Sequence, residues 1–251
     1  SYQDLRDSRL SAGHLHGDCG TVAGTTIAKN AREPRDRRVI KPYNAPMKEK
    51  AGFLVMKGNL FESAIMKTSV IDEDFQNRFL ENPDDPKAFE GRAVVFEGSE
   101  DYHERVNNPN LGMDENSILV IRYTGPVGWP GSAEVVNMQP SDALLKKGIT
   151  SLPTIGDGRQ SGTAGSPSIL NASPEAATGQ GLALLETGDM IRVDLNAKTV
   201  NMVVSEEVLD KRRESLAVKV PPSQTPWQEV YRSTVGSLAT GGCMELATAY
   251  Q

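Results

Sequence analysis

The chain has 251 residues, of which 38% are hydrophobic and 24% are charged, and its formal net charge is −6 at pH 7. This length suffices for one large domain or two smaller ones with a hydrophobic core. The acidic balance and the lack of a basic stripe exclude a protein that binds nucleic acid by neutralising phosphates. No apolar run approaches the roughly 18 residues of a membrane-spanning helix, and the first residues show no apolar region of a signal peptide. We therefore expect no nucleic-acid partner and no membrane partner.

The N-terminal residues and the cysteines bear on domain organisation and compartment. The chain begins with Ser rather than Met, and its polar start runs into HLHGDCGTV without a strand or a helix cap. We expect residues 1–14 to be a linker or the tail of a preceding domain and residues 15–251 to form one domain, although a processed complete protein fits equally well. Cys19 and Cys243 lie far apart and outside any C-x-x-C spacing, which disfavours a disulfide framework and favours a reducing, cytoplasmic compartment.

Short apolar runs, separated by many of the 23 glycines and 15 prolines, predict short strands joined by turns. Residues 117–125 are dense in β-branched and aliphatic side chains, which is typical of a buried strand. Residues 190–205 alternate apolar and polar side chains around a central Asn-Ala and predict a β-hairpin. The other predicted strands cover residues 51–60, 63–71, 91–100 and 151–158.

Capping signals predict helices between these strands. Ser173 and Pro174 are typical of a helix start over residues 173–189, because Ser caps the first N–H groups and Pro fits the first turn. The other predicted helices cover residues 101–109, 140–149, 205–217 and 225–238. The sum is an α+β fold in which peripheral helices cover a closed or nearly closed barrel, since closure hides the edges of short strands.

Three segments, residues 15–26, 124–140 and 156–173, hold more glycine and polar residues than a scaffold needs. The second and the third each follow a predicted buried strand, where loops commonly carry functional sites. Glycines there allow main-chain N–H groups to converge on an anion. These segments are therefore the candidates for chemistry.

The third segment brings together Asp157, Arg159, Ser161 and Thr163. Arg159 suits a carboxylate ligand, which a guanidinium binds in bidentate fashion. Ser161 lacks the G-x-S-x-G context and a nearby histidine, so acyl transfer by a hydrolase triad is poorly supported. A phosphate-binding loop is weaker still, because its lysine is absent.

Glu134 follows the Gly- and Pro-rich loop of the second segment instead of belonging to a charged surface run. A single glutamate is most often simply solvated. Carboxylate oxygens at a strand end nevertheless suit Mg²⁺, which takes few protein carboxylates and keeps water or substrate at its other positions. The residues alone leave both interpretations open.

Several motifs, in order, resemble the dihydroxy-acid and sugar-acid dehydratase family. GPVGWPGSAEVVNMQP resembles its GP-x-G-x-PG-x-x-E loop, and SLPTIGDGRQSGT resembles the strand that leads into its DGR-x-SG motif. SPEAATGQGLALLETGDMIRVDLNAKTV resembles the segment that follows, and LHGDCGTVAGTTIAKNA, GNLFESAIMK and GRAVVFEGSED resemble three earlier ones. The resemblance runs from about Leu15 to the C-terminus.

The resemblance implies a swivelling β/β/α barrel that forms the C-terminal half of a hydro-lyase, which converts a 2,3-dihydroxy acid to a 2-keto-3-deoxy acid. It implies that Glu134 is a Mg²⁺ ligand and that Ser161, as an alkoxide, removes the proton from C2. Thr163, Arg159 and Asp157 are expected to bind the substrate. An N-terminal domain would supply the other Mg²⁺ ligands and the cysteines of an Fe–S cluster, expected to be 2Fe–2S, so this chain alone is expected to be inactive.

Departures from the branched-chain members of the family favour a sugar acid as substrate. Those members have an apolar residue at Gln160 and a histidine at Asn171, whereas SGTAGSPSILNASPEA more closely resembles the pentonate (arabinonate and xylonate) dehydratases. We expect a cytoplasmic homo-oligomer whose partners are the sugar acid and its own N-terminal domain. The alternatives are the dihydroxy-acid dehydratase of branched-chain amino-acid synthesis and a non-catalytic acid-binding module.

Overall fold

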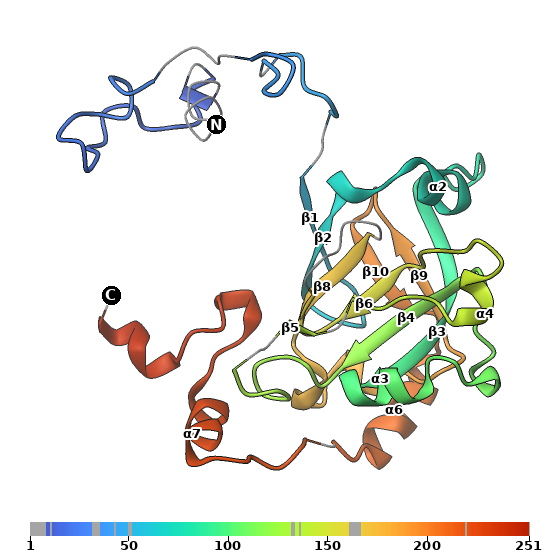
Figure 1. The fold of residues 1–251 in the computed structure, drawn as a ribbon. Helices are drawn as coiled ribbons and strands as arrows, with labels where there is room; N and C mark the ends of the chain where they lie inside the picture. Colours follow the sequence, from blue (N-terminus) through green and yellow to red (C-terminus); the bar gives the residue numbers. More distant parts are fainter. Residues whose placement is uncertain are drawn as a thin grey trace. The chain divides into compact units, whose positions relative to one another are not determined.

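The computed structural model describes residues 9–10, 12–31, 36–42, 44–49, 52–131, 134–135, 137–160, 167–218 and 220–250 (Figure 1). Contacts divide the chain into two compact units, Ser1–Ala51 and Gly52–Gln251. The boundary that we expect from the sequence, between residues 14 and 15, stays a prediction. In the first unit the described residues form turns and bends, two helical residues at Arg9 and Leu10, and one isolated bridge between Gly20 and Thr26.

The second unit is built on a mixed eight-stranded sheet, with the order β1-β2-β8-β6-β4-β3-β9-β10. The central strands β3, β4, β6 and β8 run parallel to one another, and the outer pairs are antiparallel. The strands are β1 Phe53–Met56, β2 Ser63–Lys67, β3 Ala88–Glu97, β4 Ser117–Arg122, β6 Thr154–Gly156, β8 Ser168–Ser173, β9 Met190–Asp194 and β10 Thr199–Met202. A separate parallel pair consists of β5 Glu134–Val135 and β7 Arg159–Gln160.

The two ends of this sheet nearly close into a barrel just beyond β1. Lys57 forms an isolated parallel bridge with Thr199 of β10. Its N–H donates to the carbonyl of Lys198 at 3.0 Å, and the N–H of Val200 donates to the Lys57 carbonyl at 2.8 Å. The predicted α+β barrel of short strands is confirmed at this level, because closure pairs strand edges that would otherwise be open.

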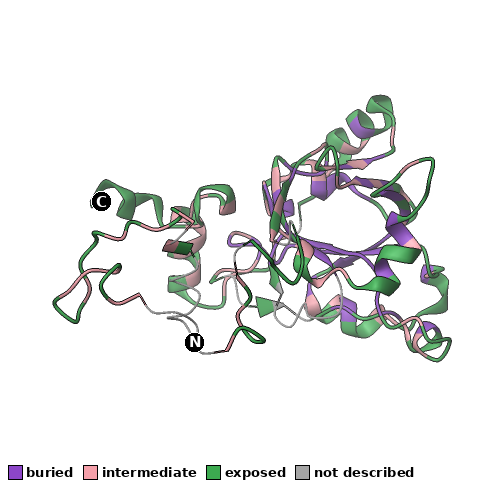
Figure 2. Cartoon of the chain, turned by 90° about the horizontal axis from the view of Figure 1, so that it is seen from above, coloured by how far each residue is buried: buried purple, intermediate pink, exposed green. Residues whose placement is uncertain are grey.

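Two hydrophobic clusters explain the apolar run of β4, in which Ser117–Ile121 are all buried. Ile118 and Val120 belong to the cluster inside the barrel, to which all eight strands contribute. Leu119 and Ile121 belong to a second cluster on the outer face of β3 and β4. A strand that is buried on both faces has a continuous run of hydrophobic residues in its sequence. Figure 2 shows the buried residues along the ring of strands.

The helices lie at the periphery of the barrel unit, as predicted. Helix α7 begins with the predicted cap, because the Thr225 side chain and Gln228 form a capping box and Pro226 occupies the first turn.

None of the helices in the described part of the chain has the length and apolar character of a membrane span. The helices are α2 Glu73–Phe75, α3 Ser99–Arg105, α4 Asp142–Leu145, α5 Gly181–Leu184, α6 Glu206–Ser215 and α7 Pro226–Thr234, with a π-helix at Gln76–Leu80 and 3₁₀ turns at Thr68–Val70, Pro109–Leu111, Ala176–Thr178, Leu238–Thr240 and Glu245–Tyr250.

The predicted helix over residues 173–189 is wrong. Ser173 ends strand β8, which the sequence analysis treated as part of a loop, and only a 3₁₀ turn and the four-residue α5 follow it. The first N–H groups bond elsewhere: that of Ala176 donates to the side chain of Asp157. Gly179, at φ +75°, then ends the 3₁₀ turn. Tertiary partners therefore override a local helix signal here.

Candidate functional site

The candidate site lies where the parallel strands β4 and β6 end and the chain enters its two glycine-rich loops (Figure 1). The short strands β5 and β7 bring these loops together, with Glu134 opposite Arg159 and Val135 opposite Gln160. Both Glu134 and Arg159 are exposed. Two of the predicted site residues, far apart in sequence, are thus neighbours on adjacent strands.

Ser161 and Thr163 lie outside the described residues. The backbone that leads to them is described, because Gln160 immediately precedes Ser161 and pairs with the strand that carries Glu134. The chain becomes described again at Pro167, directly before β8. The predicted roles of Ser161 and Thr163 stay predictions.

Asp157 is bound by groups of the chain itself, and its predicted contact with the substrate stays a prediction. Its side chain is fully buried, and its two oxygens accept four hydrogen bonds from within the chain. The donors are the N–H groups of Tyr123 (3.0 Å), Thr124 (2.9 Å) and Ala176 (2.9 Å) and the hydroxyl of Thr124 (2.8 Å). Through these bonds Asp157 joins the ends of β4 and β6 to the turn after β8.

Glu175 holds the backbone of the glycine-rich loop that follows β4. The sequence analysis did not identify this residue. Its carboxylate accepts the N–H groups of Val127 and Gly128, each at 2.8 Å, and is almost completely buried. The residue was counted as part of a helix start, where acidic side chains are common. Glu175 lies two residues after the end of β8, a strand that the sequence analysis did not predict.

Close packing explains two glycines of the motifs. A Cβ at Gly125 would lie 2.6 Å from Oε2 of Glu175, and one at Gly158 would lie 2.7 Å from the carbonyl oxygen of Thr124. Both contacts are shorter than van der Waals separation, so a side chain at either position would displace the loop. Arg232 of α7 adds a further restraint, because its Nε donates to the carbonyl of Val127 at 2.8 Å.

Burial controls the ionisation of the two loop-holding carboxyls. Burial raises the pKa of Asp157 above its ordinary value, and the hydrogen bonds from Thr124, Ala176 and Tyr123 oppose that rise. Burial also raises the pKa of Glu175, against the bonds from Val127 and Gly128, and the nearby Asp157 carboxylate raises it further. These groups therefore hold protons more tightly than exposed carboxyls do.

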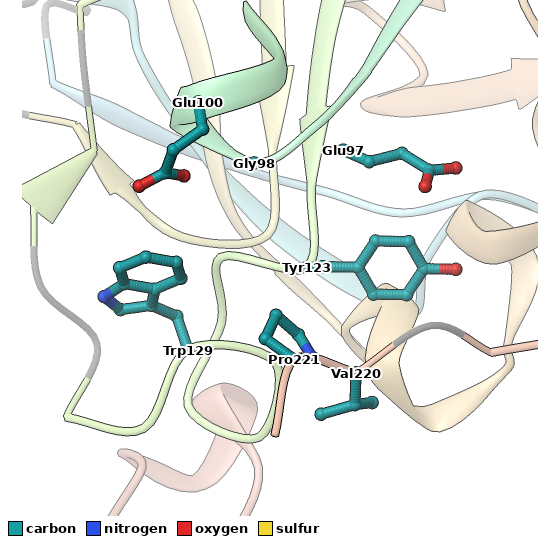
Figure 3. A pocket seen from close by; sticks show the side chains of 7 residues that line it. All are labelled: Glu97, Gly98, Glu100, Tyr123, Trp129, Val220 and Pro221. Atoms are coloured by element: carbon teal, nitrogen blue, oxygen red, sulfur yellow. The ribbon is translucent and has the colours of Figure 1, made fainter. Parts of the chain in front are cut away.

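A cavity of about 270 Å³ adjoins the ends of β3 and β4 (Figure 3). Trp129 and Tyr123 line it together with the carboxylates of Glu97 and Glu100. The Glu97 carboxylate accepts Nη2 of Arg122 at 3.0 Å. Two carboxylates in the wall repel an acidic ligand, so this cavity is a poorer place for a sugar acid than the exposed Arg159.

Glu134 is compatible with a Mg²⁺ ligand, because it is an exposed carboxylate at a strand end, beside a glycine-rich loop. Mg²⁺ commonly binds one or two protein carboxylates and keeps several other oxygen ligands. Within the described residues no three His, Cys, Asp or Glu side chains gather as a metal site. Cys19 and Cys243 are both free and exposed, and one lies in each of the two units.

Comparison with known proteins shows that the sequence is similar to the C-terminal parts of dehydratases. The family model described as "Dihydroxy-acid/6-phosphogluconate dehydratase C-terminal" matches residues 38–242. The chain is 59% identical over 244 residues to the D-xylonate dehydratase of Caulobacter vibrioides, an alignment that covers 96% of this chain and 41% of that protein.

Two further relatives extend the comparison. The L-arabinonate dehydratase of Rhizobium leguminosarum bv. trifolii is 38% identical over 80% of this chain and 33% of its own length. The dihydroxy-acid dehydratase of Clostridium beijerinckii is 34% identical over 90% of this chain and 39% of its own length. The chain thus spans less than half of each of these relatives.

Proposed function

Because the chain belongs to the dihydroxy-acid/6-phosphogluconate dehydratase C-terminal family, we propose that it is the C-terminal part of a hydro-lyase that dehydrates an aldonate to a 2-keto-3-deoxy acid. The observation that carries the proposal is the β5–β7 pair, in which Glu134 lies opposite Arg159. Arg159 lies two residues before Ser161 in the sequence. The names of the relatives, xylonate and arabinonate dehydratases, support a sugar acid as the substrate.

In this proposal Arg159 binds the carboxylate of the aldonate, which its planar guanidinium matches. Glu134 is the Mg²⁺ ligand from this chain. The four hydrogen bonds of Asp157 and the two of Glu175 keep the loops of Arg159 and Glu134 in register. A fixed backbone matters because misplacement of a reacting group by about 1 Å can cost a factor of about 10² in rate.

The Ser161 alkoxide takes the proton from C2, and the electron pair left on C2 moves to form the C2–C3 double bond. The C3 hydroxyl leaves as hydroxide and takes up the proton that Ser161 removed from C2, so that water is released and the serine alkoxide is restored. The resulting enol then tautomerises to the 2-keto-3-deoxy acid. Thr163 contacts the substrate beside Ser161. Mg²⁺ and an Fe–S cluster, when bound, would supply charge stabilisation at the carboxylate and Lewis acidity at the C3 oxygen.

The remainder of the proposed enzyme lies outside this chain. We assign the cysteines of the cluster, proposed to be 2Fe–2S, and the other Mg²⁺ ligands to an N-terminal domain, against which the barrel would swivel. The working protein is then a cytoplasmic homo-oligomer, and this chain alone is inactive. The 34% identity to a dihydroxy-acid dehydratase keeps a branched-chain dihydroxy acid as the second candidate substrate.

The test is the activity of full-length enzyme variants on D-xylonate, L-arabinonate and a branched 2,3-dihydroxy acid. Ser161→Ala should lower kcat by a factor of about 10² to 10⁴, which is the usual contribution of a positioned base to the rate. Glu134→Gln should raise the Mg²⁺ concentration needed for half-maximal activity. Ser205→Ala is the matched control, because this exposed residue makes no side-chain capping bond before α6.

Three results would each contradict a part of the proposal. Ser161→Ala with unchanged kcat would remove the assigned base. Full activity on the branched acid with none on either pentonate would replace the sugar-acid assignment by the second candidate. Turnover by this chain alone would refute the assignment of the cluster and the other Mg²⁺ ligands to another domain.

A further inference from the structure

Asn171 has an unusual backbone position in strand β8. It adopts φ +55°, in the left-handed region that non-glycine residues seldom occupy. The pairing with β2 shifts at the same point, since Ser173 pairs with Ser63 but Leu170 pairs with Ile65. Asn171 and Ala172 thus face one residue of β2. Such bulges turn a side chain away from the regular alternation and are common next to active sites.

The side chain of Asn171 has an unsatisfied polar atom. Its Oδ1 is buried and has no hydrogen-bond partner within the described part of the structure. Its backbone N–H donates to the carbonyl of Gly158 at 3.2 Å, which places the residue beside the loop between Asp157 and Arg159. Buried acceptors are nearly always paired, so an unpaired one calls for a partner.

Backbone conformation alone does not account for this asparagine. Glycine adopts positive φ without steric cost and would leave no buried carbonyl oxygen unpaired. Lys198, at φ +59° in the turn between β9 and β10, shows that this fold also tolerates other side chains in that conformation. What distinguishes Asn171 is a buried acceptor at the edge of the proposed site.

We propose that Oδ1 of Asn171 accepts a hydrogen bond from a substrate hydroxyl beyond C3, which makes Asn171 a specificity-determining residue for polyhydroxylated acids. This inference rests on the proposed function. A sugar acid carries such hydroxyls and a branched 2,3-dihydroxy acid does not. A site with an acceptor for a hydroxyl disfavours a ligand that lacks the hydroxyl, because the acceptor is then left buried and unpaired.

The test combines removal of the Asn171 carboxamide from the full-length enzyme with removal of a hydroxyl from the substrate. The substrates are the pentonate that the wild-type enzyme prefers and its 4-deoxy and 5-deoxy analogues. We expect wild-type kcat/KM to fall about tenfold or more for one analogue. In Asn171→Gly, kcat/KM for the pentonate and for that analogue should differ by less than about twofold. The loss of the carboxamide and the loss of the hydroxyl remove the same hydrogen bond, so their effects are coupled. Asn171→Ala is the second deletion variant if the glycine variant does not fold.

Two controls exclude a merely structural effect. Asn171→Asp retains an acceptor oxygen and should retain the preference for the hydroxyl. Lys198→Gly changes a positive-φ residue in the turn between β9 and β10, and should also retain it.

The outcomes separate the inference from the function on which it rests. A deletion variant that keeps the full wild-type preference would overturn the inference while the proposed function stands. Equal wild-type rates on the pentonate and both analogues would do the same. A wild-type enzyme that dehydrates no pentonate would overturn both.

Discussion

At the scale of single residues, the buried carboxylates do most to organise the site. Asp157 and Glu175 accept six hydrogen bonds between them, five from main-chain N–H groups. Such bonds secure irregular loops, because buried N–H groups without a partner are costly. The two carboxyls thus connect the glycine-rich loops to the strand ends.

The raised pKa of Glu175 predicts a pH-dependent contribution to stability. The folded chain holds this proton more tightly than the unfolded chain does. The stabilisation is therefore complete below the ordinary pKa of about 4.3 and is lost as pH rises through the folded value. In Glu175→Gln the group no longer titrates, while Asp157 titrates in both proteins. The difference in unfolding free energy between wild type and variant should shrink from pH 4 towards pH 7.

Urea unfolding of both proteins across this range measures the difference. Near neutral pH the variant should remain less stable by about 1–3 kcal/mol, because the amide group of Gln faces a main-chain N–H that needs an acceptor. Glu214→Gln, at an exposed position in α6, is the matched control and should show neither effect. If the difference in unfolding free energy between wild type and Glu175→Gln grew with pH, the raised pKa of Glu175 would be contradicted.

At the scale of elements, the junction after β1 decides whether the sheet closes. The backbone at Gly58 passes so close to β10 that a Cβ would lie 1.9 Å from the carbonyl oxygen of Val200. No side chain fits there unless the bridge between Lys57 and Thr199 opens. A glycine at this point is therefore a requirement of closure.

Gly58→Ala should destabilise the chain by about 1–3 kcal/mol or more, the usual cost of forcing extra atoms into a packed region. Gly52→Ala is the matched control, since a Cβ at Gly52 meets no atom within 4 Å. Thermal unfolding of both variants provides the measurement. Equal melting temperatures for the two variants would show that the closure at Gly58 is not strained by a side chain.

At the scale of the whole molecule, the hydrophobic core belongs to the second unit. Every residue of the two core clusters lies between Met56 and Leu209. The first unit, residues 1–51, contributes none of its described residues to them. Stability of a domain comes chiefly from such burial, so the barrel should fold without the first unit.

Deletion of residues 1–51 should therefore change the melting temperature by less than about 4 °C, which corresponds to about 1 kcal/mol for a domain of this size. Deletion of residues 218–251 is the comparison. It removes the bond from Arg232 to Val127 and the contact between the hydroxyls of Ser173 and Ser237, and it should cost more. Loss of cooperative unfolding in the first truncation would show that residues 1–51 complete the fold.

Local sequence was a sound guide where the partners of a residue lie close by in the chain. The buried strand β4, the β9–β10 hairpin and the capped start of α7 were all predicted, because periodicity, turn residues and caps act over a few residues. The family motifs likewise lie within short segments, and they identified the dehydratase family that the comparisons confirm.

Tertiary structure decided what depends on distant partners. Ser173 to Glu175 carry a helix start, yet Ser173 ends a strand and the carboxylate of Glu175 holds a loop nearly fifty residues earlier in the sequence. The four donors that Asp157 accepts come from other segments, which the local sequence does not reveal. The pairing of Glu134 with Arg159 likewise arises only when β5 and β7 meet. A buried polar group is satisfied by whichever donor the fold brings to it, and the sequence by itself determined only the local elements and the family.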